Sequence, residues 1–401
     1  MDSCLCTIRI HFSYFGKNDL YHALVQGNKV HLMEKNTKII AVIAVVAILV
    51  VAGVGTILLA GGRTDGNKVV YWTVVAPGEQ KNALKAGIVD GAIGWEAYTS
   101  SALIDGTANA VKWSGDVWPN HPCCVLVVSK NFVNNNATNQ DLVARIVKVQ
   151  IVANEWLTKT IQEGSGANFT ALLQTGAAFA NVNTSVIQEA VLNGHTKFVS
   201  GISEGAKTGL ANFTRSLASL GQITGLGGYS KVTDFVNGTI NATYLQRASE
   251  INESATILNP STPVRMMYLT GDIHQFARVI AMNTSLWGGK TLFERYGVAV
   301  NYKAPSPVGG PIMDAIQAGQ VDVGYVGCVP VILKRINVPT YIEIVSVLNL
   351  EGSAIIAKAP MHTFDDLNGK LIATPGPTSI QHFLLLYYAT ALGYTVKLKG
   401  T

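Results

Sequence analysis

AIQAGQVD at residues 315–322 is repeated as ALKAGIVD at residues 83–90, so the chain contains two copies of the pattern A-[LI]-x-A-G-x-V-D. In each copy a helix-forming run ends on a glycine that can adopt the left-handed conformation, and a short apolar strand follows. Two such units predict an α/β fold with two lobes and a cleft between them. Generic alternation of strands and helices is the alternative interpretation.

The sequence around both copies continues this alternation. Strands are predicted at 69–75, 88–93, 264–269, 298–302, 321–326, 342–348 and 354–357. Helices are predicted at 79–86, 142–160, 186–193, 210–220, 275–283 and 311–318. The polar segment 249–263, which ends in Asn-Pro-Ser-Thr-Pro, is the expected linker between residues 61–248 and residues 264–401.

The composition is unusually apolar, with 48% hydrophobic and only 14% charged residues. Part of this excess is expected to lie in a membrane. The net charge of +5 is spread thinly over 401 residues, which gives no support for binding to nucleic acid.

Residues 39–60 contain no charge and are long enough to span a bilayer as a helix. Lys35 and Lys38 precede this segment, so we expect a single-pass anchor in the cell membrane with the later residues outside the cytoplasm. A cleaved signal peptide is the alternative. Eight Asn-x-Ser/Thr sequons follow the segment and none precedes it, which agrees with export. Residues 1–38 form an N-terminal extension. Met33 is interpreted as the natural start, and residues 1–32 as the result of a mis-assigned start codon.

The five cysteines show no C-x-x-C spacing, and no H-x-x-x-H occurs, so neither a structural zinc site nor a disulfide framework is expected. Cys123 and Cys124 are interpreted as two buried thiols rather than a strained disulfide. The chain lacks a Walker loop and paired carboxylates. We therefore expect no enzymatic activity, no metal and no cofactor.

The chain after residue 60 resembles the substrate-binding proteins of ABC importers for nitrate, sulfonates and taurine. The resemblance is carried by GDIHQ at 271–275, Gly309-Gly310, residues 315–330, EGS at 351–353, DLNGKLIATPG at 366–376 and residues 87–98. It implies a type II periplasmic-binding-protein fold that captures a small anion and delivers it to permease subunits.

The order of the two halves differs from that family, in which the part seen here at 264–401 comes first. The chain therefore looks circularly permuted or cut from a tandem array, and residues 69–98 are expected to pack beside residues 370–401. The stretch Gly94-Trp95-Glu96-Ala97 also departs from the family, which usually has proline after the glutamate.

The predicted site lies where strands end and helices begin, because helix N-termini offer unpaired N–H groups to an anion. Thr374 to Ser379 precede a helix expected at 380–392, although Ser379 alone could be an N-cap. The alternative interpretation of Cys328 is a small buried residue, and that of His274 is a residue that caps a helix. The candidate ligand-binding residues are His274, Gln275, Gly309, Gly310, Gly327, Cys328, Thr374, Gly376, Thr378, Ser379, Trp95 and Glu96.

These observations favour an extracytoplasmic solute-binding protein for a sulfonate, taurine or nitrate type of anion. Two alternatives stay open: a membrane-tethered sensory module that reuses the cleft, and an enzyme of the pyrimidine-precursor type on the same fold.

Overall fold

The computed structural model describes residues 68–134, 136–193, 195–338 and 341–400. The expected anchor at 39–60 and the N-terminal extension lie outside these residues. Within the described ranges, no helix combines the length and the apolar character needed to cross a membrane. The described residues belong to one compact unit, which begins at residue 64.

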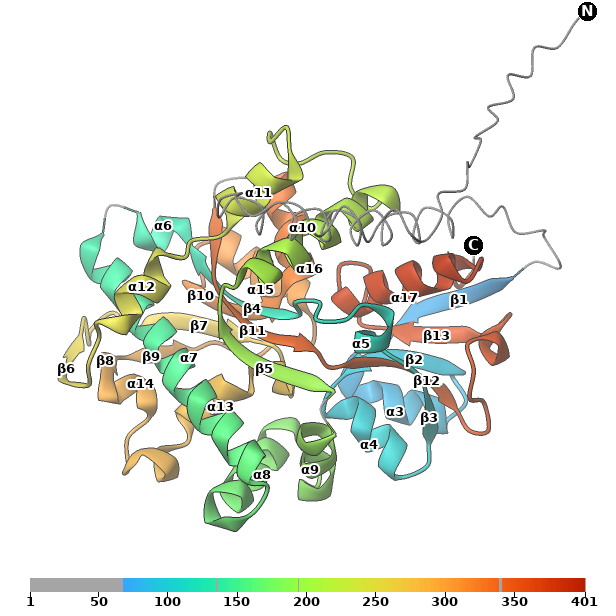
Figure 1. The fold of residues 1–401 in the computed structure, drawn as a ribbon, viewed down its shortest axis with the longest axis horizontal. Helices are drawn as coiled ribbons and strands as arrows, with labels where there is room; N and C mark the ends of the chain where they lie inside the picture. The colour runs from blue at the N-terminus through green and yellow to red at the C-terminus, as the bar shows by residue number, and fades with distance from the viewer. Residues whose placement is uncertain (1–67, 135, 194, 339–340, 401) are drawn as a thin grey trace, which may run out of the picture. The chain divides into compact units, whose positions relative to one another are not determined.

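Two six-stranded sheets organise this unit (Figure 1). The first sheet has the order β14-β1-β13-β2-β12-β3. Its strands are β1 (Val69–Val74), β2 (Gly91–Trp95), β3 (Ala108–Trp113), β12 (Ser353–Lys358), β13 (Leu371–Thr374) and β14 (Thr395–Leu398). β1 runs parallel to β13 and β14, whereas β12 is antiparallel to β2 and β3.

The second sheet has the order β5-β11-β4-β10-β7-β9. Its strands are β4 (Cys124–Ser129), β5 (Thr196–Gly201), β7 (Val264–Tyr268), β9 (Val300–Tyr302), β10 (Val323–Gly327) and β11 (Ile342–Glu351). Every residue of the central strand β4 is buried, as expected for a strand covered on both faces. β4 is antiparallel to both of its neighbours.

Helices cover both sheets. Those that pack with the first sheet are α3 (Pro77–Lys85), α4 (Tyr98–Ile104), α5 (Ser114–Val117) and α17 (Ile380–Ala391). Those associated with the second are α6 (Lys130–Val133), α7 (Ala137–Glu163), α8 (Gly166–Ala180), α9 (Thr184–Leu192), α10 (Glu204–Ser219), α11 (Val232–Thr239), α12 (Thr243–Ser249), α13 (Phe276–Met282), α14 (Leu292–Arg295), α15 (Gly309–Gln317) and α16 (Cys328–Asn337). Figure 1 shows α7 and α13 on one face of this sheet and α15 and α16 on the other.

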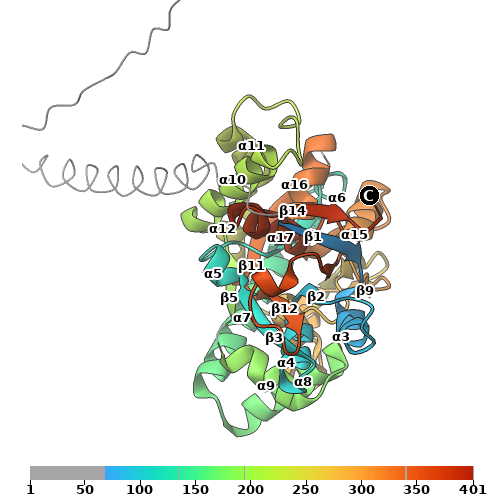
Figure 2. The ribbon, with the colours of Figure 1, turned by 90° about the vertical axis from the view of Figure 1, so that its right-hand side faces the viewer.

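The prediction that residues 69–98 pack beside residues 370–401 is confirmed. Val70 pairs with Val396 of β14, and Tyr71 pairs with Leu371 of β13. Figure 2 shows β1 and β14 side by side. Each sheet therefore takes strands from both sequence halves, and the mixed α/β class agrees with a periplasmic-binding-protein-like fold.

Both copies of the repeated pattern end their helices as expected, with Gly87 at a φ of 68° and Gly319 at 69°. The strand predicted at 88–93 begins later, at Gly91, because residues 86–90 form the turn and leave Ile88 63% exposed. The strand predicted at 298–302 is divided into β8 (Tyr296–Val298) and β9. Within the predicted linker, β6 (Ser254–Leu258) pairs with β8.

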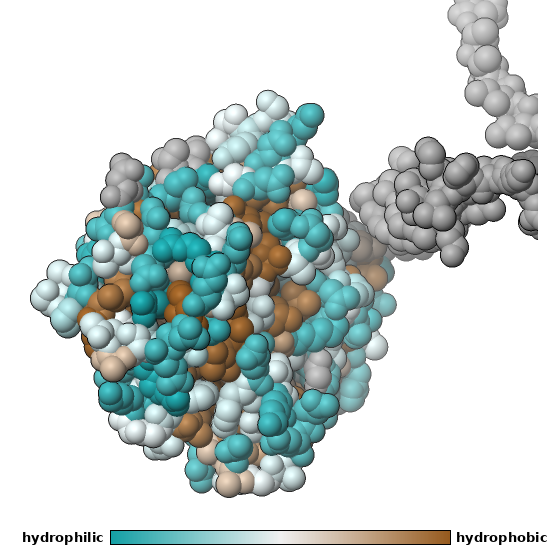
Figure 3. Space-filling model, turned by 60° about the vertical axis from the view of Figure 1, so that its left-hand side comes forward, coloured by the Kyte–Doolittle hydropathy of each residue, from teal (hydrophilic) through white to brown (hydrophobic). Residues whose placement is uncertain are grey.

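Apolar side chains are found on the outside as well as in the core. Figure 3 shows one face of the molecule, on which hydrophilic side chains surround a band of apolar ones. The large exposed hydrophobic residues are dispersed along the described chain: Val74, Ile88, Ile104, Leu192, Leu392 and Leu398. Scattered exposure of this kind is normal for a folded protein.

Candidate functional site

A cavity of about 20 Å³ lies where elements of the two sheets converge. This volume is enough for one body the size of a water molecule. β2 and the start of α17 contribute from the first sheet, and β4, the segment after β7 and the end of β10 from the second. The lining residues are Trp95, Cys123, Cys124, Leu269, Asp272, His274, Gly309, Gly327, Pro330, Ser379, Ile380 and Gln381. We call this space the inner cavity.

Cys123 and Cys124 are held in place by main-chain hydrogen bonds at the start of β4. The Cys123 N–H donates to the carbonyl oxygen of Asn349 (3.1 Å), and the Cys124 N–H donates to Asn349 Oδ1 (2.8 Å). On the other side, the Cys328 N–H donates to the carbonyl oxygen of Cys123 (2.8 Å). The positions of both thiols are therefore set by a fully bonded backbone.

Asp272 and His274 approach these thiols from the loop after β7. The His274 N–H donates to Asp272 Oδ1 (2.9 Å), which caps the short 3₁₀ turn η1 (Ile273–Gln275). His274 Nε2 lies 2.8 Å from the carbonyl oxygen of Gly352, and Nδ1 lies 3.4 Å from Cys123 Sγ. The Cys124 thiol donates to Asp272 Oδ2 (3.4 Å).

All four of these side chains are buried, and they change one another's protonation. Burial raises the pKa of Asp272 to about 6. Burial also opposes a charge on His274, but the neighbouring Cys123 and Asp272 outweigh this effect and raise the His274 pKa to about 10. Although burial disfavours its ionisation, the hydrogen bond from Cys124 and the charge of His274 lower the pKa of Cys123. Both shifts favour the charged forms, a thiolate on Cys123 and a protonated ring on His274.

Five of the residues predicted from the sequence line the inner cavity: Trp95, His274, Gly309, Gly327 and Ser379. The structure thus brings together residues from five of the predicted segments. Ser379 also caps α17, since its Oγ accepts the His382 N–H at 3.1 Å.

The other predicted residues do not line the cavity. Gln275 donates to the Leu269 carbonyl oxygen (2.7 Å), and Thr374 Oγ1 lies 3.3 Å from His382 Nδ1. Cys328 Sγ faces the carbonyl oxygen of Pro122. The residues that line the cavity do not include Gly310, Gly376 or Thr378 either.

Glu96 is turned away from the cavity towards the N-terminus of α4. Its Oε2 accepts the Ser100 N–H (3.1 Å), and its Oε1 accepts the Ser100 hydroxyl (2.8 Å). Burial raises its pKa to about 7. The described contacts of this carboxyl are those of a buried helix cap.

Cys123, Cys124 and Asp272 were missed as site residues by the reasoning from sequence. Their side chains meet His274 only in the fold, because Cys123 and His274 are 151 positions apart. The signal in the sequence is the adjacent pair of cysteines at the start of a wholly apolar strand, together with Asp-x-His after another strand. Ligand spacing within a single helix turn or loop cannot reveal such an arrangement.

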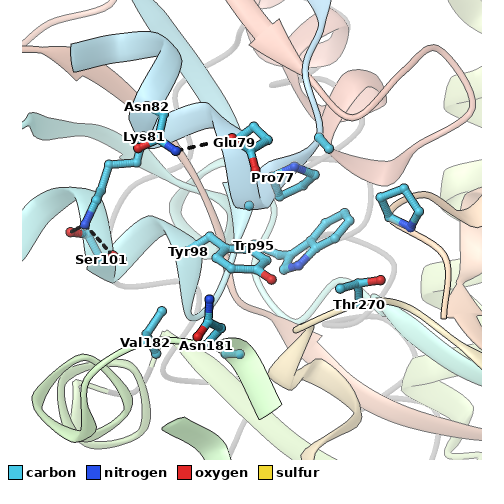
Figure 4. Close-up of a pocket in the computed structure, with 14 residues that line it drawn as sticks. Pro77, Glu79, Lys81, Asn82, Trp95, Tyr98, Ser101, Asn181, Val182 and Thr270 are labelled. Carbon is cyan, nitrogen blue, oxygen red and sulfur yellow. Dashed lines mark hydrogen bonds between the residues drawn. The ribbon is translucent and has the colours of Figure 1, made fainter. Parts of the chain in front are cut away.

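A larger pocket of about 460 Å³ lies on the other side of Trp95, a size typical of small-molecule sites. We call it the outer pocket. It is lined by Ala76, Pro77, Gly78, Glu79, Lys81, Asn82, Trp95, Tyr98, Ser101, Ala180, Asn181, Val182, Thr270 and Pro307. Figure 4 shows Trp95 and Tyr98 between the start of α3 and the segment that carries Asn181 and Val182.

Trp95 separates the two spaces and lines both of them. It is only 3% exposed, and its indole Nε1 is a buried donor without a hydrogen-bond partner among the described residues. A buried indole N–H normally has a partner, so this donor is available to a ligand. Lys81, by contrast, already contacts Ser101 Oγ (2.9 Å) and Asp105 (3.0 Å).

A comparison with family models gives a match to the NMT1-like family over residues 52–168. This match supports a substrate-binding protein, in agreement with the motifs in the sequence. Among solved structures, the crystal structure of NikA from Brucella suis in complex with Fe(III)-EDTA is 11% identical, with a TM-score of 0.29. The alignment covers 70% of this chain and 55% of that protein, so the chain spans about half of its length. No curated protein matches the chain.

Proposed function

We propose that the chain is the extracytoplasmic solute-binding protein of an ABC importer. Its solute is a small anion of the sulfonate, taurine or nitrate type, held in the outer pocket and delivered to permease subunits. The observation that carries this proposal is the position of the outer pocket. α3, β2 and α4 line it from the first sheet, whereas the end of α8 and Thr270 line it from the second. A site between two α/β units is where a solute can be enclosed.

The polar groups of the outer pocket support a small anion. α3 begins at Pro77, which has no N–H, and its N-cap Ala76 offers no side-chain cap; the first N–H of the helix at this end of the pocket is that of Gly78. A helix N-terminus carries partial positive charge and favours an anion. The unpartnered Trp95 N–H adds a second donor. Glu79 on the same wall suits a solute that also carries an ammonium group, as taurine does.

Calorimetry on the purified full chain with taurine, methanesulfonate and nitrate tests the solute class. We expect saturable binding of at least one of the three, and weakening by about tenfold or more in Trp95→Phe, which removes one hydrogen bond to a charged group. Trp156→Phe is the matched control, because Trp156 packs against Trp287 and does not line the pocket. The absence of saturable heat with all three solutes would contradict the proposal.

The location outside the cytoplasm is tested separately. Residues 39–60 are proposed as the anchor, so the chain should sediment with membranes and the part after residue 60 should be cleaved by protease added to intact cells. Complete protection of that part would contradict the extracytoplasmic assignment.

A further inference from the structure

We propose that Cys123, Cys124 and His274 bind one Zn²⁺ ion at the inner cavity. Cys123 Sγ, Cys124 Sγ and His274 Nδ1 all lie within 4.8 Å of one another. Asp272 lies beside this set, with Oδ2 3.4 Å from Cys124 Sγ and Oδ1 3.3 Å from His274 Nδ1. The proposal is independent of the solute, because these ligands line the inner cavity and do not line the outer pocket.

The distances between the ligand atoms fit the edges of a zinc tetrahedron. Bond lengths of about 2.3 Å to sulfur and about 2.0 Å to nitrogen and oxygen give edges of roughly 3.5 Å between sulfur and nitrogen or oxygen, and roughly 3.3 Å between nitrogen and oxygen. The distance from Cys123 Sγ to His274 Nδ1 is 3.4 Å, and all three ligand atoms lie within 4.8 Å of one another. The ligands therefore need little movement to enclose an ion.

The groups behind the ligands are those that support a metal site. A histidine that binds metal through one ring nitrogen usually donates its other N–H to a carbonyl or carboxylate. His274 Nε2 has such a partner in the Gly352 carbonyl oxygen at 2.8 Å, so Nδ1, which gives up its proton when an ion binds, faces the Cys123 thiol. The Asn349 side chain and main chain hold the backbone of both cysteines. The whole set is thus preorganised.

The donor set selects the metal. Two thiolates and an imidazole favour a thiophilic ion such as Zn²⁺ over Mg²⁺ or Ca²⁺, which prefer oxygen ligands. Three ligands from the protein leave one position of the tetrahedron, beside which the Asp272 carboxylate lies. The inner cavity is large enough for one ion and too small for an organic solute. The ion is therefore expected to stay in the protein rather than to be its transported solute.

Co²⁺ titration of the reduced, chelator-treated full chain tests the proposal, because cobalt replaces zinc and reports thiolate ligands by charge-transfer absorption. We expect one Co²⁺ per chain, displacement by one Zn²⁺, and a loss of affinity of at least about 100-fold in Cys123→Ser and in Cys124→Ser. This expected loss of affinity is larger than the loss of about 10–100-fold that is typical when a residue behind the ligands is replaced. The thermal midpoint of the wild-type chain should also fall when a chelator removes the ion.

Two control variants locate the ion. Cys328→Ser removes the third buried thiol of the described chain, which contacts Pro122 and is not part of the ligand set, so cobalt absorption should be unchanged. The double variant Cys4→Ser, Cys6→Ser should also retain it. The proposal is overturned if the wild-type chain binds no stoichiometric cobalt, or if binding persists in both Cys123→Ser and Cys124→Ser. Circular dichroism of each variant distinguishes loss of the site from loss of the fold.

Discussion

His274 and Gly352 form a direct link between the two sheets. Gly352 is the one residue between β11 of the second sheet and β12 of the first, and its carbonyl oxygen lies 2.8 Å from His274 Nε2. Gly352 adopts a φ of 90°, and a Cβ at this position would collide with His274 Nε2 and Thr196 Oγ1. The glycine thus allows the backbone to approach the imidazole closely.

Gly352→Ala is expected to reduce stability and to displace His274. The positive φ alone costs about 1–2 kcal/mol for a residue with a Cβ, and the collision adds to this cost. Gly369→Ala is the matched control, because Gly369 has a φ of 71° but a Cβ there would meet nothing within 4 Å. Urea unfolding should show a larger loss for Gly352→Ala than for Gly369→Ala. Equal losses would mean that the contact with His274 is unimportant.

Glu96→Gln should change how stability depends on pH. The folded chain raises the Glu96 pKa from 4.5 to about 7, so the carboxyl is neutral in the folded state and ionises on unfolding between these values. The contribution of this group is therefore present below pH 4.5 and is lost as the pH rises to 7, by about 3 kcal/mol in total. Glutamine cannot ionise, so the free energy of unfolding of the variant should rise relative to that of the wild type as the pH increases from 4.5 to 7. Parallel unfolding curves at pH 5 and pH 8 would contradict this interpretation.

The contribution of His382 to stability should depend on pH with the opposite sign. Burial lowers its pKa from 6.5 to about 4, so the neutral ring is favoured in the folded state. Its contribution is present above pH 6.5 and is lost as the pH falls to 4, again by about 3 kcal/mol. His382→Gln should therefore lose less stability than the wild type on acidification. Because the ranges of Glu96 and His382 overlap, each variant must be compared with the wild type at every pH.

Ser379→Ala and Thr378→Ala separate a helix cap from a ligand contact. Ser379 Oγ accepts the His382 N–H and donates to the Gly376 carbonyl oxygen, so its loss should cost about 1 kcal/mol of stability. Thr378 is exposed, and its replacement should change stability by less than about 0.5 kcal/mol. Thermal melts and solute calorimetry on both variants check this. A loss of solute affinity in Thr378→Ala, without loss of stability, would place the anion at this loop instead of the outer pocket.

Much of the fold could be predicted from local patterns. The repeat A-[LI]-x-A-G-x-V-D correctly predicted α3 and α15, the left-handed glycines that end them and the buried strands that follow. Periodic apolar residues predicted α7, although its ends at Ala137 and Glu163 extend beyond the prediction. The ends of β2 were harder to predict, because the run 88–93 has apolar residues in both the turn and the strand.

The candidate site was predictable only in part. Glycines and caps at the ends of strands pointed to Gly309, Gly327 and Ser379, since their role depends on local backbone geometry. The direction of the Glu96 side chain was not predictable, because it depends on the cap of α4 formed with Ser100. The meeting of Cys124 with Asp272 depends on two strands of the second sheet, from positions 148 residues apart.

The position of β1 has a consequence for how the protein is made. β1 is the first described strand, yet its neighbours β13 and β14 lie about 300 residues later; the Val69 N–H donates to Asn368 across a separation of 299 positions. A ribosome synthesises β1 long before its hydrogen-bonding partners exist, so the first sheet cannot form in the order of translation. Such non-local pairing slows folding. During synthesis β1 therefore has no partner from the first sheet until β13 and β14 have been made.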